Sequence, residues 1–219
     1  MRFTTVYQKL YRQHGPQHWW PGETPFEVMV GAVLTQNTAW INVEKAITNL
    51  RAARRLDAAA ILRTPHARLA KLLTPSGYFN VKAKRLRSLC AWYVEQGGYD
   101  ALKQLTTPHL RTELLAQHGI GPETADDILL YAFERPVFVV DAYTRRLFKR
   151  LELIAGDEAY ELLRAGIERH LARSDNKTAL FNEFHALIVV HAKDICRPHP
   201  RCEQCCLARN CSYYAKIKL

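Results

Sequence analysis

The sequence predicts an all-α protein of about ten helices. Thr-Pro pairs occur at residues 24–25, 64–65, 74–75 and 107–108. Threonine suits the capping position of a helix and proline its first turn, so each pair predicts a helix start. Apolar residues then recur at helical spacing through long intervals without proline. The one strand-like run, residues 137–140, is too short to form a sheet by itself.

The first strong helix signal is the Thr24-Pro25 pair. Thr24 and Glu27 have the spacing of a capping box, in which each side chain binds the other residue's backbone amide. The apolar residues that follow share one helical face: Phe26, Val30, Val33 and Leu34. Because no further proline occurs before Pro65, this interval has room for two helices.

A tight helix–turn–helix is predicted at residues 114–125, where Gly119 and Gly121 permit a sharp turn. The second of these helices ends before Pro136. No proline occurs between residues 137 and 197, and two apolar sets in this interval each fall on one helical face. They are Leu147, Leu151 and Ile154, and Leu180, Phe184 and Leu187.

The composition is that of a folded, basic protein. The 219 residues are 48% hydrophobic, which is enough for a core and excludes a disordered chain. The 31 Lys and Arg residues exceed the 21 Asp and Glu residues, for a net charge of +10. The excess is concentrated in a basic block, residues 58–94, which holds seven basic residues and no acidic one. This distribution predicts a polyanionic partner.

Neither a membrane nor a secretory destination is predicted. No apolar stretch approaches the roughly 18 residues that span a bilayer. The first residues lack the apolar core of a signal peptide. We therefore expect a soluble, cytoplasmic protein that binds no membrane.

The turn at residues 119–121 is typical of a phosphate site. Its glycines leave the backbone unshielded, and the next helix presents unpaired amides and the positive end of its dipole. An ordinary connection between two helices is the alternative. Asp141, which follows the apolar run 137–140, also has two interpretations. It could cap the helix that starts at Ala142, or it could be a catalytic carboxylate.

Five of the six cysteines lie in the last 24 residues. Because disulfides are uncommon in cytoplasmic proteins, this cysteine tail predicts metal binding. Cys196, Cys202, Cys205 and Cys211 contain one Cys-x-x-Cys pair rather than the two of a zinc ribbon. Four such thiolates can hold a four-iron cluster, and zinc is the alternative. Cys90 has apolar neighbours and is expected in the core.

Together these motifs resemble the helix-hairpin-helix DNA glycosylases of the endonuclease III superfamily. The resemblance rests on the hairpin at residues 119–125, on Val139-Val140-Asp141 and on the cysteine tail. With the N-terminal residues described below, the similar elements extend from residue 19 to residue 211. The combination is specific, whereas each motif alone is not.

The resemblance implies two helical domains with a DNA-binding cleft between them. The helix-hairpin-helix domain would comprise residues 23–135, and the domain with the iron–sulfur loop residues 1–22 and 136–219. The partner would be double-stranded DNA with a damaged base, bound by a monomer associated with the nucleoid. We expect the basic block, residues 145–150 and the cysteine tail to contribute to the DNA-binding surface. The phosphate-binding residues would be Gly119, Gly121, Thr124 and Arg145.

The resemblance also makes Asp141 the catalytic carboxylate. Cleavage of an N-glycosidic bond builds positive charge on the sugar, which a carboxylate stabilises while it orients or deprotonates water. Glu123 departs from the family pattern, because bifunctional members carry a Schiff-base lysine at this position. A glutamate cannot form that intermediate, so we expect a monofunctional enzyme that leaves an abasic site. Glu123 itself suits the first turn of a helix, where the dipole favours an acidic residue.

The resemblance assigns a 4Fe–4S cluster to Cys196, Cys202, Cys205 and Cys211. The interval before Cys202 is one residue shorter than in the family, and either Cys205 or Cys206 could be the third ligand. The expected role is structural, because the cluster would hold a loop against the DNA backbone. A redox-sensing role is the alternative.

The N-terminal part resembles the bacterial 3-methyladenine glycosylase branch. That resemblance implies that aromatic side chains stack on a flipped, alkylated purine, whose positive charge is attracted to tryptophan. The implied pocket residues are Trp19, Trp20, Pro21 and Trp40. Gln36 would fill the gap that the everted base leaves. The alternatives are aromatic core residues and, for Gln36, a polar residue at a helix end.

We therefore expect a monofunctional DNA glycosylase of base excision repair that removes an alkylated purine such as 3-methyladenine. A glycosylase for oxidised pyrimidines or mismatched bases is an alternative on the same fold. A non-catalytic protein that binds damaged DNA is an alternative of a different class. The presence of both Asp141 and Gln36 argues against this last interpretation.

Overall fold

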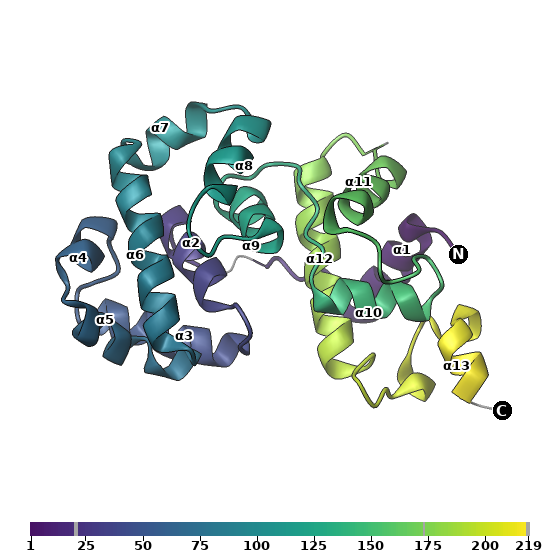
Figure 1. Cartoon of the computed structure of the whole chain (residues 1–219). Coiled ribbons are helices and arrows are strands. Elements are labelled where there is room, and N and C mark those ends of the chain that lie inside the picture. Colours follow the sequence, from purple (N-terminus) through teal and green to yellow (C-terminus); the bar gives the residue numbers. More distant parts are fainter. Residues whose placement is uncertain (20–21, 173, 218–219) are drawn as a thin grey trace. The chain divides into compact units, whose positions relative to one another are not determined.

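The structure is a computed structural model that describes residues 1–19, 22–172 and 174–217. The chain folds into two compact units, which Figure 1 shows as separate groups of helices. The hairpin unit comprises Trp20–Arg135. The terminal unit comprises Met1–Trp19 and Pro136–Leu219, so it contains both ends of the chain.

The hairpin unit is built from helices that follow one another with short connections. In chain order they are α2 (Pro25–Leu34), α3 (Trp40–Ala52), α4 (Ala58–Arg63), α5 (His66–Leu72), the 3₁₀ turn η1 (Thr74–Ser76), α6 (Phe79–Glu95), α7 (Gly98–Gln104), α8 (Thr107–Leu115), α9 (Pro122–Asp127) and the π-helical turn η2 (Ile128–Ala132). Helices α4 and α5 pack against α6, and α8 packs against α9.

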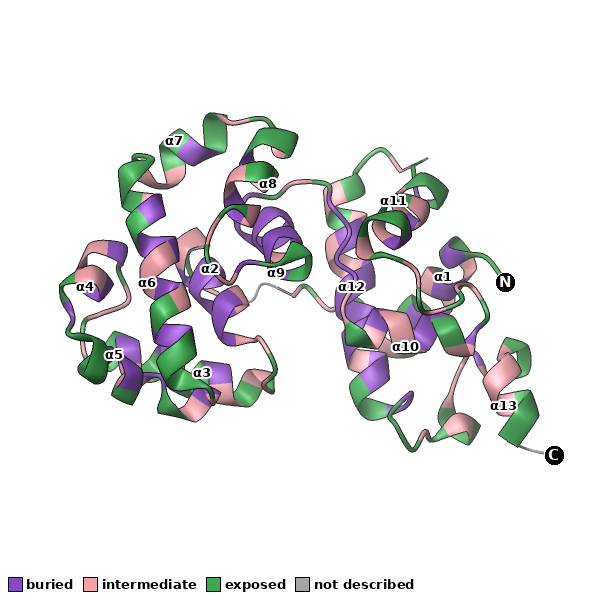
Figure 2. Cartoon of the chain, in the orientation of Figure 1, coloured by how far each residue is buried: buried purple, intermediate pink, exposed green. Residues whose placement is uncertain are grey.

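Helix α2 is the centre of the hairpin unit. It is buried along most of its length (Figure 2), because nearly all its side chains are apolar and neighbouring helices surround it. It packs against α3, α6 and η2. Its fully buried side chains include Met29, Val30, Val33 and Leu34.

The terminal unit combines the first helix of the chain with the last ones. Its elements are α1 (Phe3–His14), α10 (Ala142–Arg150), α11 (Tyr160–His170), α12 (Lys177–Asp194), the 3₁₀ turns η3 (Cys202–Gln204) and η4 (Ala208–Asn210), and α13 (Ser212–Ile217). Helix α12 is the longest and packs against both α1 and α10.

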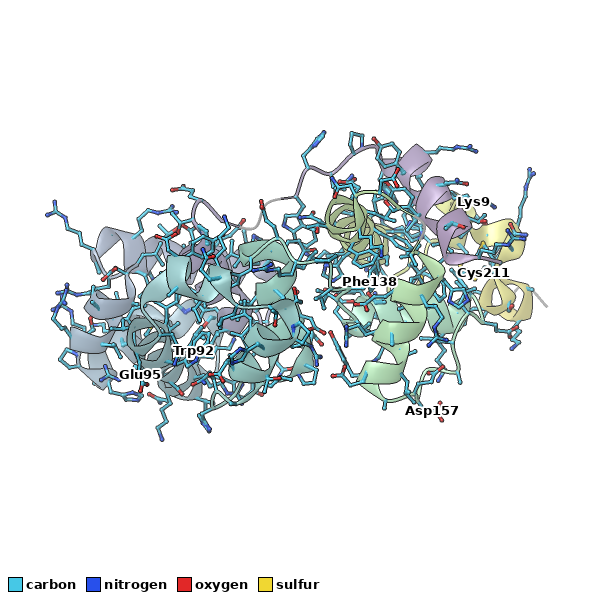
Figure 3. All side chains as sticks on the ribbon, turned by 90° about the horizontal axis from the view of Figure 1, so that it is seen from above. Lys9, Trp92, Glu95, Phe138, Asp157 and Cys211 are labelled. Atoms are coloured by element: carbon cyan, nitrogen blue, oxygen red, sulfur yellow. The ribbon has the colours of Figure 1, made fainter. Side chains whose placement is uncertain are left out.

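Aromatic side chains form the core of the terminal unit. Phe138 is fully buried in its interior (Figure 3). Its ring meets Phe181 and Phe184 edge-on, with centroids 5.6 and 5.7 Å apart. Phe3 and Phe148 form another such pair at 4.9 Å. These contacts fix the extended run that leads into α10.

The structure confirms the all-α prediction, because the described residues contain no strand. Residues 137–140 are buried, but they form no strand and join no sheet. The described residues form thirteen α-helices, more than the ten or so expected. Five of these helices have only six or seven residues, which is too short for apolar periodicity to detect. None of the described helices has the length and apolarity needed to cross a bilayer.

Among the described residues, the threonine side chain caps a helix in one of the four Thr-Pro pairs, Thr24-Pro25. Thr24 Oγ1 accepts the Glu27 amide at 3.1 Å. The hydroxyl groups of Thr64 and Thr74 instead donate backwards, to carbonyl groups of the preceding helix. Glu27 also differs from expectation, because its carboxylate binds the Arg51 guanidinium at 2.9 and 3.0 Å.

Candidate active site

Asp141 lies where the buried run 137–140 turns into α10. It is the N-cap of this helix, and its Oδ1 accepts the Thr144 amide at 2.7 Å. The side chain is only 14% exposed. The structure therefore confirms the capping role of Asp141. That role occupies one carboxylate oxygen and leaves the other for a second contact.

His185 of α12 faces the second oxygen of Asp141. Its Nε2 lies 3.6 Å from Asp141 Oδ2, and the His185 side chain is 6% exposed. Burial by itself raises the pKa of Asp141, but the nearby His185 imidazole and the Thr144 amide hold this pKa below its ordinary value. Asp141 is therefore a partly buried carboxylate that is ionised at neutral pH.

The sequence patterns do not single out His185. It stands between Phe184 and Leu187 on the apolar part of α12, where helical periodicity predicts only core residues. The sole signal in the sequence is a histidine among apolar neighbours. Its partner Asp141 is 44 positions away, so the pairing depends on the packing of α10 against α12.

Trp19 extends this group of side chains. Its ring is parallel to the His185 ring within 2°, with centroids 6.2 Å apart. Trp19, His185 and Asp141 therefore lie together in the terminal unit. Of the other predicted pocket walls, Trp20 and Pro21 lie outside the described residues. Trp40 belongs to the hairpin unit, where its Nε1 donates to a carboxylate one turn along α3 at 2.8 Å.

Gln36 is held against the hairpin. Its Nε2 donates to Gly119 O at 2.9 Å and to Thr124 Oγ1 at 3.0 Å. Its Oε1 accepts from an Arg85 guanidinium nitrogen at 2.5 Å. These bonds join the end of α2, the hairpin and α6. These bonds show where the Gln36 amide lies when no DNA is bound. The role of Gln36 toward DNA stays a prediction.

The hairpin requires glycine at residue 119. Gly119 has a φ of +82°, and a Cβ there would come within 2.5 Å of the Arg85 side chain. Gly121, which precedes α9, has no described atom within 4 Å of its missing Cβ, so this backbone is unobstructed. Thr124 is buried, whereas Glu123 in the first turn of α9 is exposed.

Part of the basic block is structural. Lys82 is 1% exposed, and its Nζ donates to Leu34 O at 2.8 Å and to Ser76 O at 2.6 Å. Burial lowers the pKa of Lys82 to about 8. The prediction that this block binds DNA is therefore wrong for Lys82, because its ammonium group is enclosed. Arg87 likewise donates to Thr64 O, at 2.8 Å.

The basic residues of α10 bind backbone carbonyls of the terminal unit. Arg145 donates to Glu158 O at 3.0 Å. Arg146 donates to Cys196 O at 2.9 Å, and Arg150 donates to Arg197 O at 2.6 Å. These bonds attach the cysteine tail to α10. The phosphate-binding role of Arg145 stays a prediction.

The four predicted metal ligands line one pocket in the terminal unit: Cys196, Cys202, Cys205 and Cys211. The empty space in and around this pocket is about 340 Å³, and it includes space that is open to solvent. Cys206 does not line it, and its backbone amide donates to Gln13 Oε1 at 3.1 Å. Within residues 1–19, 22–172 and 174–217, no three His, Cys, Asp or Glu side chains are placed to hold one metal ion.

Two other side chains reach these thiols. An Arg150 guanidinium nitrogen lies 3.2 Å from Cys196 Sγ, and His191 Nε2 lies 3.3 Å from Cys205 Sγ. Burial lowers the pKa of His191 to about 4, so this ring is neutral at pH 7. Burial also raises the pKa of the Cys205 thiol to about 12. A metal bound there would have to displace the thiol proton.

The chain is similar to known DNA repair proteins over nearly its whole length. Residues 30–173 match the family model described as "HhH-GPD superfamily base excision DNA repair protein". A Methanocaldococcus jannaschii protein, whose name provisionally describes it as a DNA repair glycosylase, is 43% identical over 209 residues. The match covers 94% of each chain. Endonuclease III of Thermotoga maritima is 29% identical over 196 residues, which are 88% of this chain and 84% of that one.

Solved structures show the same relationship. The H. pylori 3-methyladenine DNA glycosylase MagIII, bound to 1,N6-ethenoadenine, superposes with a TM-score of 0.76 at 32% identity, covering 88% of this chain and 98% of that one. A non-covalent endonuclease III–DNA complex superposes with a TM-score of 0.82 at 20% identity, covering 100% and 99%. This second likeness shows the fold alone. The chain therefore belongs to the HhH-GPD superfamily of base excision repair DNA glycosylases.

Proposed function

We propose that the protein is a monofunctional DNA glycosylase that hydrolyses the N-glycosidic bond of an alkylated purine. The observation that carries this proposal is Asp141, a partly buried carboxylate with a lowered pKa at the start of α10. Such a group is charged at neutral pH and shielded from bulk water, so it acts strongly on a nearby positive charge.

In the proposed reaction the bond between sugar C1′ and the base nitrogen breaks, and its electron pair leaves with the base. An alkylated purine is cationic, so it departs as a neutral molecule without needing a proton. Asp141 stabilises the positive charge on the sugar, and water then bonds to C1′ and releases a proton to the carboxylate or to solvent. Because a carboxylate of low pKa is a weak base, we expect charge stabilisation to contribute more than proton abstraction.

Glu123 supports hydrolysis without strand cleavage. A Schiff base forms when an amine attacks C1′, and a carboxylate cannot form one. Glu123 is exposed in the first turn of α9, where the helix dipole favours a negative charge. The product would then be an intact strand with an abasic site.

The aromatic residues support a purine that carries a positive charge. Trp19 lies parallel to His185 beside Asp141, and a tryptophan face attracts a cation. A relative with 32% identity, the H. pylori enzyme, is named as a 3-methyladenine DNA glycosylase. We infer a related substrate class for this chain, and the roles of Trp20, Pro21 and Trp40 toward the base stay predictions.

The hairpin is the proposed phosphate-binding element. The open backbone at Gly121 suits a close approach by phosphate, with Gly119, Thr124 and Arg145 as further contacts. In the same proposal Gln36 fills the gap left by the everted base. It must then release its bonds to Gly119, Thr124 and Arg85 when DNA binds.

We also infer that Cys196, Cys202, Cys205 and Cys211 hold a 4Fe–4S cluster. The donor set fits by its chemistry, because four cysteine side chains are among the residues that line one pocket of the terminal unit. Four cysteine thiolates are the usual ligand set of a 4Fe–4S cluster. When bound, the cluster would supply four iron–thiolate bonds that fix the loop of the cysteine tail.

The choice between Cys205 and Cys206 can be tested directly. We expect Cys205→Ser to lose bound iron and Cys206→Ser to keep it, because Cys205 lines the pocket and Cys206 does not. Iron and acid-labile sulfide in anaerobically purified protein, together with visible absorbance, measure the difference. A colourless protein that contains zinc would contradict the cluster. Loss of iron from Cys206→Ser alone would exchange the assignment of the third ligand.

A panel of duplexes, each with one lesion, tests the proposed function. The panel includes 3-methyladenine, an oxidised pyrimidine and a mismatched thymine, and each product is analysed with and without hot alkali. We expect release of the methylated purine, with strand breaks only after alkali. Release of another base alone would refute the substrate class. Strand breaks before alkali would refute the monofunctional mechanism.

A further inference from the structure

We propose that His185 is a positioning residue that keeps the Asp141 carboxylate ionised and correctly oriented for base excision. This inference rests on the proposed catalytic role of Asp141 and adds a residue that the sequence motifs do not contain. The evidence is the arrangement of contacts around the two carboxylate oxygens.

Each oxygen of Asp141 has its own neighbour. Oδ1 accepts the Thr144 amide at 2.7 Å, which ties it to the first turn of α10. Oδ2 faces His185 Nε2 at 3.6 Å, which is beyond ordinary hydrogen-bond distance but within ion-pair distance. The carboxylate is therefore fixed by the amide, whereas Oδ2 is oriented by His185 and can still accept a bond from water.

His185 is itself held in place. It is 5% exposed on α12, and its neighbour Phe184 packs against Phe138 in the core. The parallel ring of Trp19 lies beside the imidazole. The imidazole therefore cannot turn into solvent without disrupting the core.

The other titratable and charged groups nearby have different contacts. On α11 the Tyr160 hydroxyl accepts the Val140 amide at 3.4 Å, and on α10 Arg145 donates to the loop at Glu158. On α12 itself, Glu183 accepts backbone amides of the segment that follows α1. On α1, Tyr7 meets the Phe184 ring. The charge of His185 is among the main causes that lower the Asp141 pKa.

The direction in which loss of His185 should change the Asp141 pKa can be predicted. Burial raises the pKa of Asp141, and His185 works against this effect. Removing the imidazole should therefore raise the Asp141 pKa, so the carboxylate becomes protonated at a higher pH. Since excision requires the ionised form, the acidic limb of the rate profile should move to higher pH as well.

The experiment compares wild type, His185→Phe, His185→Gln and the control His170→Phe. His170 is an exposed histidine of α11 in the same unit, so its replacement should leave Asp141 unaffected. Carboxyl ¹³C NMR of the labelled full-length protein gives the Asp141 pKa, with Asp141→Asn to assign the signal. Single-turnover excision of 3-methyladenine against pH and the Kd for the same duplex complete the measurements.

We expect His185→Phe to raise the Asp141 pKa and to slow excision by about tenfold to a hundredfold, with an unchanged Kd. His185→Gln keeps a donor without the charge, so it should recover part of the rate but not the wild-type profile. This variant also preserves the test if His185→Phe does not fold.

An Asp141 pKa and a rate profile that match wild type in the variants would overturn the inference. A proportional loss in His170→Phe would overturn it as well, because the effect would then be a general loss of structure. If the Asp141 pKa shifts as expected but wild type excises no methylated purine, the proposed function fails and the influence of His185 on Asp141 remains.

Discussion

Asp141→Asn is expected to slow the single-turnover excision of a methylated purine by about 100- to 10,000-fold. The amide is neutral, so it cannot stabilise positive charge on the sugar as the carboxylate does. DNA binding should change little, because Asn is nearly as good a helix cap as Asp and can still accept the Thr144 amide. Excision under enzyme excess and the Kd for the same duplex separate the two effects.

A matched control is available at Asp57. This residue caps α4 in the same way, because its Oδ1 accepts the Ala60 amide at 2.9 Å. Asp57→Asn changes the same chemical group at a helix cap far along the chain, and it should leave excision unchanged. Full excision by Asp141→Asn with normal DNA binding would remove Asp141 from the mechanism. Equal losses in both variants would indicate a stability effect instead.

The second large effect is expected at a buried ion pair in the hairpin unit. Arg111 of α8 contacts Asp126 of α9 at 2.7 and 3.2 Å, with side chains 15% and 0% exposed. Asp126→Ala leaves the guanidinium without this partner in a nearly buried site, which should cost about 3–5 kcal/mol of unfolding free energy. Since the pair joins the two helices of the hairpin, DNA binding should weaken as well.

Urea denaturation measures this loss. The matched control is Glu161→Ala, which removes one carboxylate from a more exposed pair with Arg164 at 3.0 Å. It should cost at most about 1 kcal/mol. The double variant Arg111→Met with Asp126→Leu should regain much of the lost stability, because it removes both charges of this pair. A loss at Asp126 no larger than that at Glu161 would contradict the structural importance of the pair.

Local sequence signals predicted the helical fold but not all of its boundaries. The helical spacing of apolar residues around Val30 predicted a buried helix face, and the side chains of α2 are indeed buried. A Thr-Pro pair is a weaker signal, because a threonine hydroxyl can serve either neighbouring helix. The Thr24 hydroxyl caps the helix that follows it, whereas the Thr64 hydroxyl donates to a carbonyl of the helix that precedes it.

Site residues could be predicted where a local sequence motif defines the structure around them. Asp141 follows an apolar run and starts a helix, so its place could be read from the chain. His185 could not, because its pairing with Asp141 depends on how two distant helices pack. The same limit explains Lys82, which the sequence presents as one charge among several. Only the fold shows that two carbonyl groups enclose its ammonium group.

Borohydride trapping during turnover tests the proposed hydrolytic mechanism most directly. Borohydride reduces a Schiff base to a stable protein–DNA cross-link, so it detects any amine that attacks the sugar. With a duplex that contains one 3-methyladenine, we predict release of the free base and no cross-linked protein, as Glu123 replaces the lysine of bifunctional relatives. A cross-link formed in proportion to the released base would contradict the mechanism and show that another amine of this chain attacks the sugar.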